Sequence, residues 1–369
     1  MRTEQIETVI VGAGQAGLAT AYHLGKHNHP CLVIDANTRV GDNWRRQWDS
    51  LRLYSPARYD GLPGMAFPAA GWSCPGKDDV ADFLEAYAHR FRLPVRLSTR
   101  VRRVDPDPRG GFLVQTDNTT LAARNVVVAT GTFGRTPAIP KCAADLDPAI
   151  LQLHSSEYRR PEQLRDGPTL VVGASHSGAD IAYEVAATRP TTLCGRDCGS
   201  IPVRPESWQA RLMFPLMIFA WRHVLTRRTP IGRQEMPKVR FHGAPALRVK
   251  PADLRDRDVT RIEQRIAGAR GGRPTTADGQ VLDVANVVWC TGFRQVFDWI
   301  HLPVIGPDGW PDEMRGVVDS APGLYFCGLS FQYAFSSMVL PGVGRDAAYV
   351  ADCIRRRAPD QATIDHQLV

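Results

Sequence analysis

The sequence predicts an α/β fold made of two similar units, each built around a parallel β-sheet. Two glycine-rich turns, VGAGQAG (residues 11–17) and VGASHSG (172–178), each follow a run of β-branched residues and precede a helical pattern. The turns are 161 residues apart, counted from Gly12 to Gly173, and further matches recur at this spacing. A length of 369 residues also suits two domains better than one.

The first unit begins with a strand over residues 8–11, whose apolar β-branched residues are typical of a buried parallel strand. The glycine turn follows, and then a helix with Leu18, Tyr22 and Leu24 inward and Gly25 at its C-terminal end. Residues 31–35 form the second strand. Strand, glycine turn, helix and strand in this order predict a Rossmann-type unit.

The second unit repeats this order with a strand over residues 169–172, a helix through Ile181 and Val185, and a strand over 191–196. Each copy then continues with a hairpin at an Asp turn, at Asp117 and Asp278. The repeat also pairs residues 99–101 with 260–262. Each copy closes with an apolar strand that ends in Thr-Gly, at 125–131 and 286–292. We expect one constant register from Gly12 to Gly131.

The glycine turns predict two phosphate-binding cradles. The first glycine of such a motif permits a tight turn, the second lets the backbone approach a pyrophosphate, and the third lets helix pack on strand. The free N–H groups at the helix N-terminus attract the phosphate charge. The alternative, a plain connector, is less consistent with two copies in matching context. In the second copy Ser175 replaces the middle glycine, and its hydroxyl can itself bond a phosphate.

The ends of the two second strands differ in charge. Asp35 lies eighteen residues past the third glycine of its copy, and Arg196 occupies the same position in the other. A carboxylate there accepts hydrogen bonds from ribose hydroxyls, whereas an arginine pairs with a 2′-phosphate. An exposed strand-end arginine beside Asp197 is the alternative. The pair predicts one dinucleotide with a free ribose and one NADP, and we assign FAD and NADPH.

With these motifs the sequence resembles the class B flavin-dependent monooxygenases, which include flavin-containing monooxygenases, plant indole-pyruvate monooxygenases and Baeyer–Villiger enzymes. The resemblance runs from about residue 9 to residue 354 and includes a Gly-Gly-x-Trp-like stretch at 41–44 and the strand GLYFCGL at 323–329. It implies an FAD domain interrupted by an inserted NADP domain, with boundaries at 1–146, 147–294 and 295–369. It also implies that the helix begun near Gly342 and Gly344 points its N-terminus at the flavin carbonyls.

The motifs and the resemblance together give two sets of cofactor-binding residues. The set expected to contact FAD is Gly12, Ala13, Gly14, Ala16, Gly17, Asp35, Ala36, Gly41, Asn43, Trp44, Val101, Ala129, Thr130, Gly131, Gly328 and Leu329. The set expected to contact NADP is Gly173, Ala174, Ser175, His176, Ser177, Gly178, Arg196, Thr291 and Gly292.

The sequence also departs from the family pattern. Of the signature Phe-x-Gly-x-x-x-His-x-x-x-Tyr only His154 and Tyr158 remain, since Pro148 and Ile150 occupy the first two places. Baeyer–Villiger enzymes usually end this signature in Trp, so Tyr158 argues against them. Asp42 replaces a glycine, and residues 50–55 lack the Asn that several members set against the flavin. His154 is a weak catalytic candidate and fits an interdomain linker better than a general base.

The resemblance implies that NADPH reduces FAD, and that a flavin hydroperoxide then oxygenates a small lipophilic substrate with dioxygen. N- or S-oxygenation or hydroxylation is favoured over Baeyer–Villiger insertion. No side chain need act as a covalent nucleophile, because the cofactor carries the chemistry. Two alternatives remain: an NADPH-dependent flavin oxidoreductase without oxygenation, and a non-catalytic flavin- or NADP-sensing partner protein.

Composition excludes several other classes of protein. The net charge is +7, and the forty Arg and five Lys are spread along the chain. A nucleic-acid-binding protein would concentrate them in one basic stripe, so this class is not favoured. No apolar run reaches a membrane span, because Pro215, Arg222 and His223 interrupt residues 212–225. The apolar side chains there are consistent with a substrate channel, core or a homodimer patch. We expect no secretory signal, because a strand begins within the first ten residues.

Three other candidate sites are also set aside. Residues 173–177 resemble a nucleophile elbow without its last glycine. His27 and His29 lack further metal ligands, so no metal site is expected. Cys194 and Cys198 are expected to be ordinary thiols. Eight cysteines without a Cys-x-x-Cys pair indicate a reducing cytoplasm.

Overall fold

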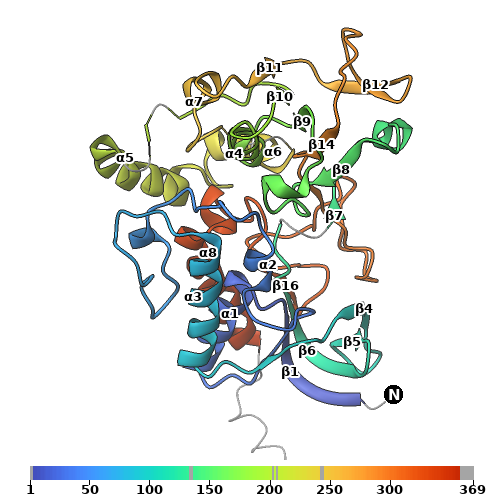
Figure 1. Ribbon diagram of the computed structural model, residues 1–369. Helices are drawn as coiled ribbons and strands as arrows, with labels where there is room; N and C mark the ends of the chain where they lie inside the picture. Colours follow the sequence, from blue (N-terminus) through green and yellow to red (C-terminus); the bar gives the residue numbers. More distant parts are fainter. Residues whose placement is uncertain (1–2, 133–135, 202, 205–206, 242–244, 358–369) are drawn as a thin grey trace, which may run out of the picture.

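The computed structural model describes residues 3–132, 136–201, 203–204, 207–241 and 245–357, and shows two Rossmann-like units (Figure 1). The second unit is inserted into the first, because the first sheet takes strands from both before and after it. This confirms the predicted fold class. The domain boundaries themselves stay a prediction, and their outer ends, residues 1–2 and 358–369, lie outside the described residues.

The first sheet has the strand order β3-β2-β1-β6-β5-β4, with β16 also paired to β6. β1, β2, β3, β6 and β16 run parallel, whereas β4 and β5 extend the sheet as an antiparallel hairpin. The strands span Thr3–Val11 (β1), Leu32–Ile34 (β2), Val95–Arg96 (β3), Val101–Pro106 (β4), Phe112–Thr116 (β5), Thr120–Val128 (β6) and Leu324–Phe326 (β16).

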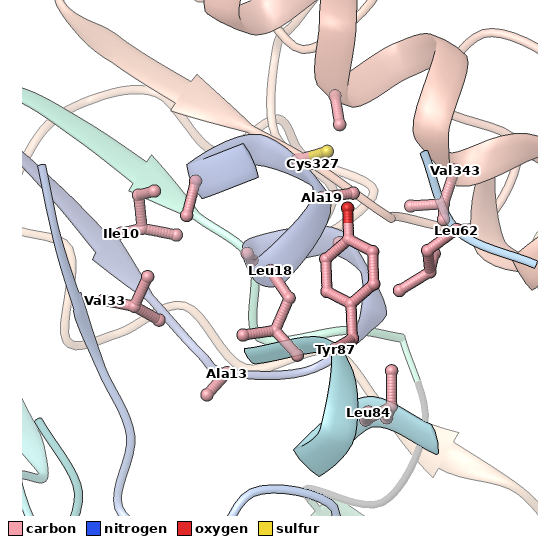
Figure 2. Close-up of a cluster of buried hydrophobic side chains, with 14 of the residues drawn as sticks. Ile10, Ala13, Leu18, Ala19, Val33, Leu62, Leu84, Tyr87, Cys327 and Val343 are labelled. Atoms are coloured by element: carbon pink, nitrogen blue, oxygen red, sulfur yellow. The ribbon is translucent and has the colours of Figure 1, made fainter. Parts of the chain in front are cut away.

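Three helices cover one face of this sheet: α1 (Gln15–Lys26), α3 (Lys77–Arg90) and α8 (Leu340–Arg357). Ile10 points to this face, while its neighbours in the strand, Val9 and Val11, point to the other, as strand geometry requires. Figure 2 shows part of the resulting core, where Tyr87 of α3 and Val343 of α8 belong to one buried cluster with the sheet. Residues between 297 and 321 cover the other face.

The second sheet is entirely parallel, with the order β11-β10-β9-β14-β8. Helix α4 (His176–Val185) packs on one face, and a separate hairpin packs near the other. The sheet strands span Leu151–His154 (β8), Thr169–Val172 (β9), Thr191–Cys194 (β10), Thr260–Ile262 (β11) and Asn286–Trp289 (β14), and the hairpin strands span Ile266–Arg270 (β12) and Arg273–Thr276 (β13).

The two units repeat one another, as predicted, in the strand before the glycine turn and in the strand that ends in Thr-Gly. Thr8 pairs with Asn125 in the first sheet, and Thr169 pairs with Asn286 in the second, which preserves the spacing of 161. The predicted register is not constant between these points, however. The N–H of Gly12 donates to the carbonyl of Ile34, and the N–H of Gly173 donates to the carbonyl of Cys194, one residue before the position that the spacing of 161 predicts. The second copy is therefore one residue shorter between the glycine turn and the end of its second strand.

The third strand and the hairpin also depart from the predicted register. Arg96 pairs with Ile34 at the end of β2, and Ile262 pairs with the equivalent Cys194 at the end of β10. The structural counterpart of 260–262 therefore ends at Arg96, and residues 99–101 lie beyond it. At Asp278 the chain makes a tight turn in which the N–H of Thr276 bonds Gln280, with a single bridge between Thr275 and Val281. β13 pairs with β12 there, so the second copy lacks the longer hairpin that precedes β6 in the first.

The chain crosses between the units twice, and the two crossings lie side by side. β7 (Thr136–Pro137) leaves the first unit and β15 (Phe293–Arg294) returns to it, and the two pair antiparallel. The N–H of Ala138 also donates to the carbonyl of Gly292. The second unit is therefore joined to the first through one narrow double connection.

A helical segment of the insertion reaches back over the first unit. It contains α5 (Trp208–Phe219), a π-helical turn at Ala220–Val224 and α6 (Pro230–Phe241). Arg227 fastens it, because its guanidinium binds the buried carboxylate of Glu313 at 2.6 Å. Within the described residues no helix is long and apolar enough to cross a membrane. The remaining short elements are α2 (Asp42–Arg45), α7 (Pro251–Arg255) and 3-10 turns at Ala57–Tyr59, Lys141–Asp145, Pro161–Gln163 and Phe335–Met338.

Candidate functional site

The first glycine turn forms an open concave backbone between β1 and α1. Gly12 has φ +113°, and a Cβ there would lie 2.5 Å from the carbonyl oxygen of Ala129. A Cβ on Gly17 would collide with the carbonyl of Gly12, so this glycine lets the helix pack on the strand. A Cβ on Gly14 meets nothing within 4 Å, and no side chain caps the helix there. The space in front of Gly14 is thus free for a ligand phosphate.

Asp35 lies at the edge of this turn, where β2 ends. Its carboxylate accepts one hydrogen bond from the N–H of Ala13 (2.7 Å) and one from the N–H of Asn37 (2.7 Å). Each oxygen keeps a second lone pair, so the carboxylate is fixed in orientation and can still accept from hydroxyls. Ala36 next to it is exposed. The geometry is the one expected for a group that holds a ribose.

The other predicted FAD residues fall into two groups around this turn. Gly328 packs on α1, since a Cβ there would lie 2.6 Å from that of Ala16, and Leu329 beside it is buried. Gly41 (φ +88°) packs against the backbone of Ala81, and from it α2 presents Trp44 to the cores of both units. Asn43 and Val101 lie at the margin of the turn. Asn43 is exposed on α2, and Val101 begins β4, just after the N–H of Thr99 donates to the carbonyl of Asp35.

The second glycine turn repeats the first. Gly173 has φ +108°, and a Cβ there would collide with the carbonyl of Cys290, the counterpart of Ala129. A Cβ on Gly178 would collide with the carbonyl of Gly173. Ser175 occupies the N-cap position of α4, in the place of Gly14, without a capping hydrogen bond from its side chain, and Ala174, His176 and Ser177 complete the turn. Since a side chain at the Gly14 position points into open space in the first unit, Ser175 is accommodated without strain.

The strand end of the second unit is where the structure corrects the sequence. Gly195, with φ +133°, stands in the position of Asp35, and Arg196 follows one residue later. The equivalence of Asp35 and Arg196 is therefore wrong by one residue. Arg196 is exposed and makes no ion pair with any described residue, since the neighbouring Asp197 accepts from the N–H of Gly199. No carboxylate occupies the acidic position of this unit.

Arg261 was not predicted as a site residue, although it lies next to this strand end. Its guanidinium donates to the carbonyls of Leu193 (3.0 Å) and Gly195 (2.5 Å) and so braces the end of β10. It adds a second positive charge beside Arg196. Nothing in the local pattern around Arg261 distinguishes it from an ordinary exposed strand arginine.

Two threonines give a direct test of whether these turns fit dinucleotides. Thr130 and Thr291 are counterparts in the Thr-Gly ends of β6 and β14, and the hydroxyl of each is buried without a hydrogen-bond partner in the described structure. The following glycines, Gly131 (φ +74°) and Gly292 (φ +78°), face open space. Unsatisfied hydroxyls cost free energy unless a ligand completes them. Both edges therefore fit a bound dinucleotide.

A buried polar network joins the two units between the turns. The hydroxyl of Tyr54 donates to Asp180 of α4 at 3.0 Å, and Arg248 pairs with the same carboxylate oxygen at 3.2 Å. Arg248 also donates to the carbonyl of Ser50 (3.3 Å). Burial raises the pKa of Asp180, and Arg248 and Tyr54 oppose this effect. The network was not predicted, although Asp180 stands out as a carboxylate on the apolar face of a helix.

The same tyrosine contacts the second glycine turn. The rings of Tyr54 and His176 lie 4.2 Å apart, centroid to centroid. Burial lowers the pKa of His176 to about 4, so its ring is neutral near pH 7. Residues 50–55, which lack the family's asparagine, thus place a tyrosine directly against the second cradle.

His154 holds the crossing strands rather than facing a reactive group. It is buried at the end of β8, with Nε2 3.0 Å from the carbonyl oxygen of Gly292 and Nδ1 2.9 Å from Ser156. Burial lowers its pKa. Tyr158, four residues on, donates to Glu184 of α4 at 2.8 Å. Both ring nitrogens of His154 are occupied, which supports a positioning role at the Thr-Gly edge.

Two cavities lie near the site. One, of about 440 Å³, lies at the junction of the units and is lined by polar groups that include Arg52, Asp180, Glu184 and Arg257. The other, of about 420 Å³, lies beneath α5 and near the N-terminus of α8; its lining residues include Tyr59, Leu62, Met65, Ile218 and Pro341, with Arg58 and Arg222 at hand. Of the apolar side chains considered for a channel, Phe214 is core.

The described residues contain no group of three or more metal-ligating side chains. All eight cysteines lie within the described residues and are free. Burial raises the pKa of Cys194 to about 11, which keeps this thiol protonated and unreactive near neutral pH.

Comparison with known proteins identifies the family. Residues 9–198 match the model of the pyridine nucleotide-disulphide oxidoreductase family. The "uncharacterized oxidoreductase CzcO-like" of Geobacillus kaustophilus is 35% identical over 95% of this chain and 98% of its own length. A probable indole-3-pyruvate monooxygenase of Arabidopsis thaliana, YUCCA9, is 27% identical over 94% of this chain and 88% of its own.

Among solved structures, the flavin-containing monooxygenase of Stenotrophomonas maltophilia superposes with a TM-score of 0.75 at 25% identity, over 96% of this chain and 99% of that one. The resemblance drawn from the motifs is thereby confirmed. The chain belongs to the pyridine nucleotide-disulphide oxidoreductase family, and its relatives and structural neighbours include flavin-dependent monooxygenases.

Proposed function

We propose that this protein is an NADPH-dependent FAD monooxygenase that oxygenates a small lipophilic molecule at nitrogen or sulfur, or hydroxylates it. Members of the family use FAD and NADPH. The observation that carries the assignment is the contrast between the strand ends. The first ends in the fixed carboxylate of Asp35, and the second in Gly195 followed by the unpaired Arg196. We assign FAD to the first cradle and NADPH to the second.

The chain's own groups would hold the cofactors as follows. Asp35 accepts the ribose hydroxyls of FAD, and the backbone around Gly14 receives its pyrophosphate. Arg196 pairs with the 2′-phosphate of NADPH, where a carboxylate would repel it. The buried hydroxyls of Thr130 and Thr291 gain their missing partners. Bound FAD supplies the hydride acceptance and oxygen activation that no side chain provides.

Other residues would set the geometry between the cofactors. Tyr54 spans from the first unit to Asp180 and His176 of the second, so it fixes the distance between the two cradles. His154 holds the carbonyl of Gly292 at the edge of the second. His154 is therefore proposed as a positioning residue and not as a general base.

The lipophilic substrate class rests on the family resemblance. The cavity beneath α5 is proposed as the substrate site, because it is large enough for a small molecule and combines Leu62, Met65 and Ile218 with a tyrosine and two arginines. Tyr158 in the place of the usual tryptophan supports N- or S-oxygenation or hydroxylation over Baeyer–Villiger insertion. The eight free cysteines support a reducing cytoplasm as its location.

Turnover under labelled dioxygen tests the proposal. The purified, flavin-loaded protein is given NADPH, ¹⁸O₂ and a panel of lipophilic amines and sulfides, and the products are weighed by mass spectrometry. We expect one labelled oxygen atom in the product for each NADPH consumed. NADPH oxidation that yields only hydrogen peroxide, or passes electrons to an added acceptor, supports a flavin oxidoreductase instead. Tight cofactor binding with no NADPH oxidation at all supports a sensor protein.

A further inference from the structure

Helix α5 carries a row of large apolar side chains that the rest of the protein leaves in solvent. We name as the α5 stripe the residues Trp208, Leu212, Leu216 and Phe219, which are 68%, 67%, 70% and 59% exposed. Spacings of four, four and three residues place them on one face of the helix. The opposite face, with Ala210, Phe214 and Ile218, is buried and holds the helix on the protein. The stripe is therefore not the face that secures the fold.

The segment that carries the stripe is strongly basic. Between Ser207 and Gln234 the sequence has no Asp or Glu, but it has five arginines: Arg211, Arg222, Arg227, Arg228 and Arg233. Arg227 forms an ion pair with Glu313. Arg211, Arg228 and Arg233 are exposed and form no ion pair with any described residue. Arg211 directly precedes Leu212 of the stripe, and its guanidinium lies near Trp72, beside which Arg58 also lies. Arg211 and Arg58 thus place positive charge at the border of the apolar row, and Arg228 and Arg233 add positive charge to the same segment of the chain.

We propose that the α5 stripe docks on the surface of an anionic lipid bilayer, a role independent of the proposed catalytic function. A surface helix whose exposed face is apolar and bordered by arginine can lie in the plane of such a surface, with its apolar side chains at the boundary of headgroups and acyl chains. Tryptophan favours that boundary. The arginines meet the lipid phosphates, and each strengthens binding by about fivefold.

The dimensions and place of α5 fit surface binding. Its 12 residues span about 18 Å at 1.5 Å per residue, too short to cross a hydrocarbon core of about 30 Å. Figure 1 shows α5 at the outer edge of the molecule, where a flat surface can reach it. The helix therefore lies on a bilayer and does not penetrate through it.

Charge argues against a second copy of the chain as the occupant of the stripe. In a two-fold contact the same patch faces itself, so the unpaired arginines of one copy would approach those of the other. The chain as a whole carries a net charge of +7, which adds to the repulsion. A surface rich in lipid phosphate removes this repulsion and uses the same charges.

Co-sedimentation of the flavin-loaded protein with vesicles tests the proposal. One set of vesicles is phosphatidylcholine alone, and the other is a mixture of phosphatidylcholine and phosphatidylglycerol. We expect at least about tenfold stronger binding to the anionic vesicles at low salt, and weaker binding as sodium chloride screens the arginines. Absence of binding to the anionic vesicles, or equal binding to both kinds, overturns the proposal.

A paired set of variants assigns the binding to the stripe. The double substitution Leu212→Glu/Leu216→Glu should reduce binding to anionic vesicles by tenfold or more. Val281→Glu/Val296→Glu, which charges two other exposed apolar side chains, should leave binding unchanged. Circular dichroism and flavin absorbance confirm that both variants fold. Unchanged binding of the first variant overturns the proposal, as does a dimer in size-exclusion chromatography that only this variant dissociates.

Discussion

The side-chain amide of Asn286 donates to the hydroxyl of Thr169 at 3.2 Å, deep inside the second sheet. Asn125 makes the same bond to Thr8 in the first sheet at 3.3 Å. Both pairs link the strand that leads into a glycine turn to the strand that ends in Thr-Gly, below the turn. The bond keeps the two strands in register, and therefore keeps the Thr-Gly end of one strand level with the turn that follows the other.

Asn286→Ala should destabilise the protein more than Asn125→Ala. The amide of Asn286 also bonds both backbone groups of Arg165, at 2.8 and 2.9 Å, whereas Asn125 bonds the exposed Arg357 and, at 3.5 Å, Glu7. Each hydrogen bond contributes about 0.5–1.5 kcal/mol net, and the two additional bonds of Asn286 are shorter than those of Asn125. Thermal unfolding of both variants measures the difference, and equal midpoints would contradict it.

Gly14→Ala and Gly12→Ala should separate cofactor binding from folding. Gly14 has extended backbone with open space around it, so its alanine variant should fold like the wild type and lose most of its flavin, because the methyl group occupies the phosphate space. Gly12→Ala should lower the stability of the apoprotein as well, since its Cβ meets Ala129. Flavin absorbance and the melting temperature of the apoprotein are the two measurements. A yellow Gly14→Ala protein would remove the first cradle from the FAD assignment.

Arg196→Ala should raise the KM for NADPH by roughly ten- to a hundredfold, the range expected for one charge-assisted hydrogen bond. The KM for NADH should change little, because NADH lacks the 2′-phosphate. Steady-state kinetics with both coenzymes provide the readout. Arg273→Ala, which removes an exposed arginine elsewhere in the same unit, is the control. An equal rise in the KM for NADH would show that Arg196 does not recognise the 2′-phosphate.

Asp60 should make the stability of the protein fall as the pH rises. It is fully buried, accepts one bond from the hydroxyl of Ser55 (2.6 Å), and leaves its other oxygen without a partner in the described structure. Burial raises its pKa from 3.8 to about 7. The folded protein then binds a proton that the unfolded chain has lost, so this contribution is complete below pH 4 and disappears as the pH approaches 7.

At 1.36 kcal/mol per pKa unit the loss amounts to about 4 kcal/mol. Asp60→Asn should flatten the pH dependence of the denaturation midpoint between pH 4 and 7. Ser55→Ala, which removes the hydrogen bond that lowers this pKa, should extend the dependence to higher pH. Parallel curves for Asp60→Asn and the wild type would show that Asp60 is not the titrating group.

Much of the architecture could be predicted because local sequence patterns determine it. Strand β9, the helices after both glycine turns, and the repeat of Gly12 in Gly173 follow from short-range periodicity and from φ values that only glycine adopts easily, whereas strand β16 was expected from the family resemblance. The misplaced equivalences, Asp35 with Arg196 and residues 99–101 with 260–262, came from assuming connections of equal length. The length of a connection carries no periodic signal, so a one-residue difference is visible only in hydrogen bonds.

The contacts between the units could not be predicted in the same way. Tyr54, Asp180 and Arg248 are far apart in the chain, and only the packing of the two sheets brings them together. The sequence also could not predict which face of α5 is exposed, because the helix is apolar on nearly every side. Tertiary packing decides both.

The return of the chain through β16 and α8 has a consequence for the order of folding during synthesis. β6 is made before residue 129, but its partner β16 and the helix that packs on α1 are made only after the whole insertion. All the strands of the second sheet have emerged by residue 289, while the first still lacks a strand. On the ribosome the inserted unit can therefore be complete while the unit that surrounds it still waits for its last pieces.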